Sequence, residues 1–139
     1  MKYFFWLGVM LLAVSCAKRT APAIDTNGTV ISLALHEKKA YGNITIAVSR
    51  IQESRCPMNA RCIRAGEAIA DLTISDEKSS AAVSLCTGTD CGMQKKEAQA
   101  TAILSTHQYQ LSLVDILPNP TKTLEKGTQK VLFSIRKIQ

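Results

Sequence analysis

Between residues 29 and 138, apolar residues recur at every second position in seven short stretches. Successive side chains of a β-strand point to opposite faces, so this period predicts strands with one buried and one exposed face. The stretches are TVISLAL (29–35), NITIAVSRI (43–51), EAIADLTI (67–74), AAVSLC (81–86), ATAILS (100–105), YQLSLVDIL (109–117) and KVLFSIRKI (130–138). Their number and spacing predict an all-β fold, a single antiparallel β-sandwich or barrel-like domain of about seven strands.

Two changes of phase interrupt this alternation. Apolar positions are even-numbered from Ile44 to Val48 and then shift to Ile51, and Ile63 is out of phase with the strand that follows Gly66. A glycine at a change of phase predicts a β-bulge or a sharp bend, so we expect a bent hairpin between the second and third strands. Residues 93–104 favour helix for a turn or two, and the proline-containing residues 117–128 predict an exposed loop.

The start of the chain has the layout of a secretory signal peptide. Residues 1–15 carry one charge at Lys2, then an apolar run from Tyr3 to Val14, then a small residue. That run is too short to span a bilayer, which takes about 20 residues. The LAVSC segment that ends at Cys16 resembles the lipobox of bacterial lipoproteins, and this resemblance implies that Cys16 is acylated and becomes the first mature residue.

Residues 16–29 are polar and contain Pro22 and Gly28, which predicts a flexible tether between the lipid and a β domain at residues 30–139. The expected location is therefore the bacterial cell envelope, with a lipid anchor in a membrane. In Gram-negative lipoproteins an aspartate directly after the cysteine retains the protein at the inner membrane. Ala17 stands there, so the outer membrane is expected.

Four cysteines remain once Cys16 is assigned to the lipid, namely Cys56, Cys62, Cys86 and Cys91. An even number in an exported chain predicts disulfides. Of the three pairings we expect the local one, Cys56–Cys62 and Cys86–Cys91, because each pair closes a short loop of turn-forming residues. Each closure contributes about 2 kcal/mol in the chain-entropy model. A zinc site fits less well, since the paired cysteines of structural zinc sites are usually separated by two to four residues. A redox function also fits less well, because the sequence contains no Cys-x-x-Cys motif.

The segment ESRCPMNARCIRAGEA (53–68) resembles the shared motif of a family of small bacterial exported proteins and lipoproteins of uncharacterised function. That motif reads approximately Asp-Ser-Arg-Cys-Pro, four residues, Cys, then Trp-Ala-Gly-Glu-Ala. Gly66 and Glu67 match it, whereas Glu53 stands in place of the aspartate and Arg64 in place of the tryptophan. The resemblance extends over most of the β domain and implies an exported protein. It implies no catalytic residue, and the second cysteine pair is an addition to the family pattern.

The residues around the first cysteine pair are rich in arginine. Arg50, Arg55, Arg61 and Arg64 lie within fifteen residues, and the guanidinium fork suits carboxylate or phosphate. This cluster is a candidate face for an envelope protein or an anionic glycan. The alternative is that Arg55 and Glu67 form ion pairs that pin the hairpin, a common device between neighbouring strands.

Other functional classes find little support in the sequence. The net charge of +6 comes with few aromatic residues, which makes nucleic acid a poor partner. No ligand spacing links His36 to His107, and there is no Gly-x-Ser-x-Gly nucleophile elbow. We therefore assign no catalytic residue, metal or cofactor and predict a binding or structural module. A thiol- or metal-binding envelope protein and a small enzyme that uses carboxylates near the hairpin stay open as alternatives.

Overall fold

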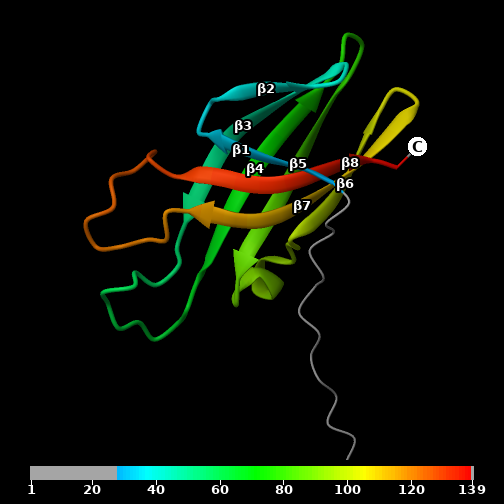
Figure 1. Cartoon of the computed structure of the whole chain (residues 1–139). Helices are drawn as coiled ribbons and strands as arrows, with labels where there is room; N and C mark the ends of the chain where they lie inside the picture. The colour runs from blue at the N-terminus through cyan, green and yellow to red at the C-terminus, as the bar shows by residue number, and fades with distance from the viewer. Residues whose placement is uncertain (1–27, 139) are drawn as a thin grey trace, which may run out of the picture.

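The computed structural model describes residues 28–138, which form two four-stranded antiparallel sheets packed face to face (Figure 1). The predicted all-β sandwich is thereby confirmed. The predicted leader, Cys16 and nearly all of the tether lie outside the described residues. The strands are β1 (Thr29–Ala34), β2 (Lys38–Tyr41), β3 (Ile44–Glu53), β4 (Glu67–Ser75), β5 (Ser80–Gly88), β6 (Gln99–Leu104), β7 (His107–Leu117) and β8 (Lys130–Lys137).

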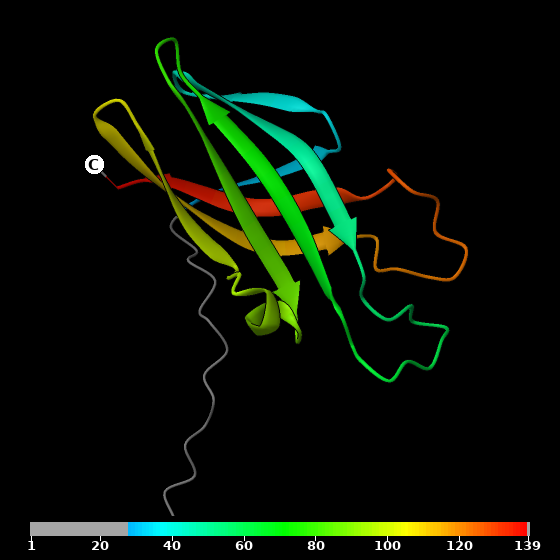
Figure 2. The same ribbon diagram turned by 180° about the vertical axis from the view of Figure 1, so that it is seen from behind.

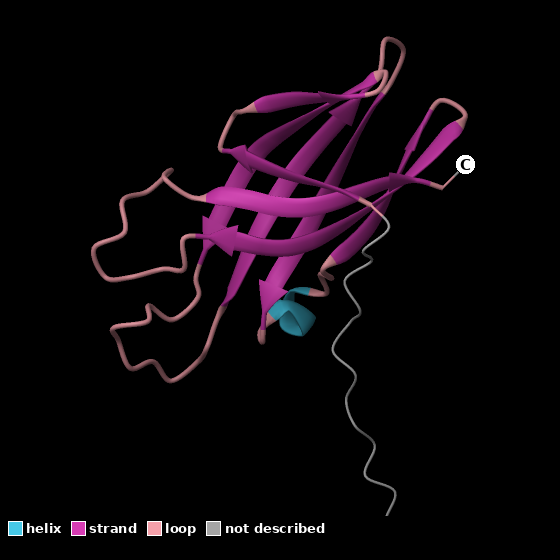
Figure 3. Cartoon of the chain, in the orientation of Figure 1, coloured by secondary structure: helices cyan, strands magenta, loops and turns pink. Residues whose placement is uncertain are grey.

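Helical structure within this range is limited to one short 3-10 turn, η1 (Cys91–Gln94), which Figure 3 shows beside the end of β5. The helix-favouring composition of residues 93–104 thus yields only the end of this turn, at Met93 and Gln94, while residues 95–98 form a connection and residues 99–104 form β6. No helix in the described part of the chain has the length and apolar character needed to cross a membrane.

One sheet has the order β1-β8-β7-β6 and the other the order β2-β3-β4-β5, and every pairing is antiparallel. Figure 2 shows the second sheet from its outer side. At one side of the sandwich the backbone N–H of Cys86 donates to the carbonyl of Glu97 (2.9 Å), which joins β5 to the segment that leads into β6. The opposite side is formed by the edge strands β1 and β2, which belong to different sheets.

The core lies between the sheets and is built mainly from alternate residues of the strands other than β2, as the sequence period predicts. Ile46, Leu72, Leu111, Phe133 and Ile135 are completely buried. Burial of each such side chain contributes about 1.5–3 kcal/mol, which makes this interface the main source of stability. The two sheets therefore hold the ends of their strands, and the loops that follow them, in fixed positions.

Two β-bulges bend strands near one end of the sandwich. The β3–β4 register shifts between Val48 and Arg50, which explains the change of apolar phase before Ile51. The β7–β8 register shifts between Leu113 and Asp115, so that Asp115 turns out of the core alternation. Both bulges precede a long loop and re-aim the side chains that lead into it.

β2 was not among the predicted strands. Its four residues are exposed or half-buried, so they carry no alternating pattern. They pair with the start of β3 through the tight turn at Gly42, whose φ of 60° suits glycine. This strand exists because β3 offers it a hydrogen-bonding edge, which no local sequence pattern reveals.

Two long loops project from the same end of the sandwich (Figures 1 and 3). The cysteine loop (residues 54–66) connects β3 to β4, and the proline loop (residues 118–129) connects β7 to β8. Together we call them the loop lobe. The described chain enters β1 at the opposite end, because Thr29 pairs with Ile135 near the end of β8, whereas the proline loop leads into the start of β8.

Candidate functional site

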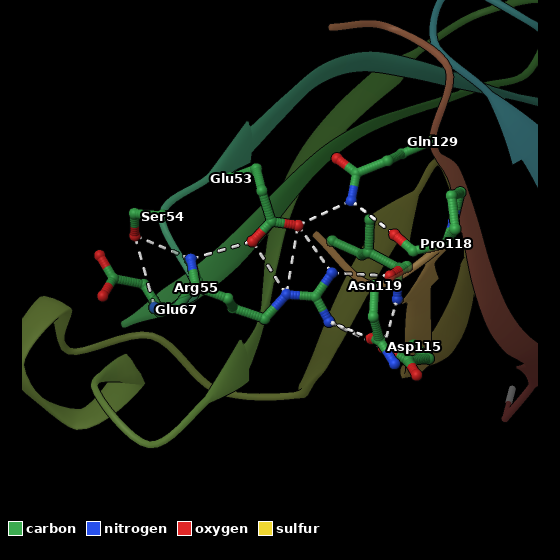
Figure 4. Close-up of polar contacts among 9 residues, drawn as sticks. Glu53, Ser54, Arg55, Glu67, Asp115, Pro118, Asn119 and Gln129 are labelled. Atoms are coloured by element: carbon green, nitrogen blue, oxygen red, sulfur yellow. Dashed lines mark hydrogen bonds and ion pairs between the residues drawn. The ribbon is translucent and has the colours of Figure 1, made fainter. Parts of the chain in front are cut away.

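Arg55, at the base of the cysteine loop, is the centre of a polar cluster that links the two loops (Figure 4). Its Nε and Nη2 donate to the two carboxylate oxygens of Glu53, at 2.9 and 2.6 Å. Nη2 also donates to the carbonyl of Ile116 (2.7 Å), and Nη1 donates to Oδ1 of Asp115 and of Asn119, both at 3.2 Å. All five guanidinium protons have partners, so this arginine is fully occupied within the chain.

Glu53 is equally saturated. Besides the guanidinium, its carboxylate accepts the backbone N–H of Arg55 (3.0 Å) and the side-chain amide of Gln129 (2.7 Å), which also donates to the carbonyl of Pro118 (2.9 Å). Glu53 ends β3 in one sheet, whereas Asp115, near the end of β7, and Gln129, the last residue of the proline loop, belong to the other. The cluster therefore ties the two sheets together at the lobe end.

The side chains of Arg55 and Glu53 are only 13% and 17% exposed. Burial alone would raise the pKa of Glu53, but hydrogen bonds from Arg55 and Gln129 outweigh it and hold that pKa below its ordinary value. The pKa of Arg55 is raised, chiefly by the hydrogen bond to Glu53 and against the cost of burial. The pair is consequently charged at neutral pH, and its geometry is that of the strong bidentate arginine–carboxylate contact.

Direct hydrogen bonds also join the tips of the two loops. The backbone N–H of Met58 donates to the carbonyl of Pro120 (2.9 Å), and the backbone N–H of Lys122 donates to Oδ1 of Asn59 (2.9 Å). The Cys56–Cys62 disulfide, with its Cα atoms 5.9 Å apart, closes the cysteine loop around this contact. The loop lobe is thus held in one conformation by a disulfide, a buried ion-pair cluster and two tip contacts.

Gly66 is required where the cysteine loop returns to β4. Its φ is +76°, and a Cβ there would lie 2.0 Å from the carbonyl oxygen of Ser54. Its N–H donates to Oδ2 of Asp90 (3.1 Å), the oxygen that also accepts Nε of Arg64 (3.1 Å). The Ala-Gly-Glu part of the motif therefore has a packing role, since only glycine allows the two sides of the loop to approach this closely.

Two pockets flank the lobe, and Thr121 of the proline loop lines both of them. The first has a volume of about 500 Å³, and the Glu53–Arg55 pair and Gln129 contribute to its lining. Its apolar lining comes from both loops and from the ends of β1 and β3: Leu35, Ile51, Pro57, Pro120 and Leu124. The second, about 690 Å³, is a shallower hollow on the outer face of the β1-β8-β7 sheet beside Met58 and Leu117.

The predicted arginine cluster is divided among separate partners. Besides Arg55, Arg50 pairs with Asp71 (2.7 Å) on the outer face of the second sheet and is 64% exposed. Arg64 pairs with Asp90 (3.1 Å), while Arg61 is exposed and makes no ion pair within the described residues.

Of the two residues expected to form ion pairs that pin the hairpin, only Arg55 does so. Arg55 pairs with Glu53 and Asp115, whereas the buried Glu67 contacts Gln94 (3.4 Å) on the other side of β4. Glu67 thus forms no ion pair within the described residues, and that part of the expectation is wrong. No sequence pattern marks Asn119 and Gln129 as members of the cluster, because each is an ordinary polar loop residue.

The remaining candidates do not meet in one cleft. Asp71 accepts from Arg50 and from Ser84 on the outer face of the second sheet, far along β4 from Glu67. His36 lies in the turn after β1, and His107 starts β7 next to Thr106. Over residues 28–138 there is no group of three His, Cys, Asp or Glu side chains that could hold a metal ion.

Both local disulfides are confirmed, which leaves Cys56, Cys62, Cys86 and Cys91 without free thiols. Two such bonds indicate an oxidising compartment outside the cytoplasm. No protein-family model, curated protein or solved structure matches the chain. The resemblance to the family of exported proteins therefore stays a prediction.

Proposed function

We propose that this chain is a non-catalytic binding module of the bacterial cell envelope, held at a membrane by lipid on Cys16, which recognises its ligand with the loop lobe. The observation that carries the proposal is the Arg55 cluster. It fixes two loops from different sheets around a pocket of about 500 Å³, the size of an ordinary ligand site. Loops positioned by a rigid sandwich are the usual location of recognition in such folds.

The chemistry of this pocket favours binding over catalysis. The charged side chains of Glu53 and Arg55 in its lining form their hydrogen bonds with each other and with neighbouring loop atoms. A general acid, a base or a nucleophile needs an uncommitted proton or lone pair within reach of the substrate. The apolar walls, by contrast, can accept an apolar ligand or an apolar side chain of a partner protein, with Glu125 and Lys126 beside them.

The position of the lobe agrees with a tethered module. β1 enters the sandwich at the end opposite the lobe, so a tether that precedes β1 leaves the loops directed away from the anchor. The proposed lipid attachment, and the outer membrane suggested by Ala17, come from the sequence around Cys16. The two disulfides support the same compartment, because an exported chain meets oxidants.

The anchor is tested by expressing the full chain in a bacterium supplied with an alkyne-labelled palmitate. We expect label and membrane fractionation for the native chain and loss of both for Cys16→Ala. Equal labelling of the two chains contradicts the proposed anchor and leaves the pocket proposal intact.

The pocket is tested by NMR titration of the β domain with octanoate and with octylamine, which share an apolar chain and differ in charge. We expect at least one probe to shift amides of residues 54–57 and 118–129. Leu124→Glu should abolish these shifts by placing a charge in the apolar wall. The matched control is Ile103→Glu on β6, an exposed apolar residue outside the lining of this pocket, which should leave them unchanged. Absence of localised shifts with both probes refutes the pocket.

A further inference from the structure

The edge strand β1 leaves backbone hydrogen-bonding groups unused. The side-chain carboxylate of Glu37 accepts the N–H of Ala34 (2.7 Å), and the N–H of Glu37 donates to the carbonyl of Ala34 (3.1 Å), so the backbone of Ala34 points away from β8. Backbone direction alternates along a strand with a period of two. Val30 and Ser32 therefore also direct their N–H and C=O groups away from β8.

The pairing of β8 with β7 independently shows which residues of β1 direct their backbone groups away from β8. The N–H of Ile138 donates to the carbonyl of Gln108 on β7 (2.8 Å), so even-numbered residues of β8 face β7 and odd-numbered residues face β1. The odd residue Phe133 is the partner of Ile31, which makes Ile31 a hydrogen-bonded residue and its neighbours outward-facing. Val30 is 58% exposed and Ser32 is exposed, and no described residue pairs with their outer edge.

The other edges of the sandwich differ from β1. β2 is four residues long and carries Lys38 and Lys39, the usual protection of a free edge against strand pairing. β5 and β6 lie next to each other and are joined through the Cys86–Glu97 hydrogen bond. β1 has six residues with no charge and no proline, which is the open template that natural sheets normally cover.

The charges around this edge indicate what covers it. Lys38 and Lys39 on β2 and Lys130, opposite Ala34 on β8, are exposed, and none of them has an ion pair within residues 28–138. The carboxylate of Glu37, in the turn between β1 and β2, is bound to the backbone of Ala34. A second copy of this chain would bring the same cations together across the new pairing. An acidic strand would meet complementary charge.

From these observations we propose that β1 is a docking edge for an extended segment of another protein, in which acidic residues alternate with apolar ones. The segment adds as a further strand to the β1-β8-β7-β6 sheet and forms hydrogen bonds with the backbones of Val30 and Ser32. Its acidic side chains are attracted by Lys38, Lys39 and Lys130. This interaction is separate from the pocket in the loop lobe and does not depend on it.

The probe is a blocked synthetic peptide in which glutamate alternates with valine, and its counterpart carries lysine in place of glutamate. Amide hydrogen exchange of the β domain is followed by NMR with and without peptide at millimolar concentration. In the free protein we expect fast exchange at Val30 and Ser32 and slow exchange at Ile31 and Leu33. The acidic peptide should slow exchange at Val30 and Ser32, and the basic peptide should not.

Ser32→Pro is the decisive variant. Proline removes the outward N–H of this residue but no bond to β8, and edge strands tolerate proline when its missing N–H faces solvent. We expect a folded protein whose affinity for the acidic peptide falls by about tenfold or more, the loss of at least one backbone hydrogen bond. Ser32→Thr keeps the N–H and should bind like the native chain, and replacing Lys38 and Lys39 with Glu should weaken binding of the acidic peptide.

Three results overturn the proposal. They are an acidic peptide that leaves exchange at Val30 and Ser32 unchanged, equal protection by both peptides, and a Ser32→Pro variant that binds like the native chain. Protection of these amides that grows with protein concentration, without peptide and together with a dimer in light scattering, would instead identify a second copy as the occupant. Loss of probe binding in the loop lobe has no bearing on these results.

Discussion

Replacing Arg55 with methionine removes the centre of the polar cluster while keeping a long apolar side chain at the site. The carboxylate of Glu53 then loses its bidentate partner, and Asp115 and the carbonyl of Ile116 lose one donor each. Breaking a buried ion pair from one side costs about 3–5 kcal/mol, because a charge is left uncompensated. Both side chains here keep some exposure, 13% and 17%, so we expect the lower end, about 3 kcal/mol.

Urea denaturation of native and Arg55→Met domains gives this difference directly, and we expect a lower midpoint with an unchanged slope. The matched control is Arg50→Met, which removes an arginine–aspartate pair whose arginine is 64% exposed. An exposed pair contributes no more than about 1 kcal/mol, so the two substitutions should differ clearly. Equal costs for the two variants, or a cost below about 1 kcal/mol for Arg55→Met, would refute the idea that the cluster is a buried clamp.

Three further outcomes follow from the same contacts. Gly66→Ala should lower the free energy of unfolding by more than about 3 kcal/mol, because the added Cβ would lie 2.0 Å from the Ser54 carbonyl oxygen. Gly42→Ala, at a φ of +60° with open space around it, should lower it by only about 1–2 kcal/mol. Similar midpoints of the two variants in urea would contradict this difference. Because the pKa of Glu53 is lower in the folded state, its ionised carboxylate stabilises the fold at pH values above the ordinary pKa of 4.5, and this stabilisation is lost as pH falls through the folded-state pKa. Glu53→Gln should therefore weaken the dependence of stability on pH in that window. A pH profile of stability that is the same in native and Glu53→Gln domains would contradict this expectation. Removing the Cys56–Cys62 bond by double alanine substitution should cost about 2 kcal/mol, and reductant should then destabilise the double variant less than the native chain.

The sequence predicted those features whose cause is local. Alternating apolar residues identified seven of the eight strands, since each pattern is read within one strand, and the shift of phase before Ile51 marked the bulge in β3. The two disulfides followed from short spacing and an even number of cysteines. β2 could not be predicted, because its residues have no periodic pattern of burial. It forms by pairing with the neighbouring edge of β3.

Only part of the candidate site could be predicted from the sequence. Arg55 and Glu53 stand in one motif, but two partners of Arg55 lie 60 and 64 residues away from it, at Asp115 and Asn119. Gln129 is 76 residues from Glu53. Which charges meet across such separations depends on how the sheets stack and on the bulge before Asp115, and neither follows from local pattern. The free edge of β1 likewise appears only once the strand order is known.

The central claim is that the two loops form one fixed lobe, and the backbone amide of Met58 tests it most directly. Met58 is 69% exposed, so its amide is protected from hydrogen exchange only through its bond to the carbonyl of Pro120 in the other loop. We predict measurable protection in the native domain and its loss in Arg55→Met, while the core amide of Leu72 stays protected in both. Exchange of the Met58 amide at the unprotected rate in the native domain would contradict the account.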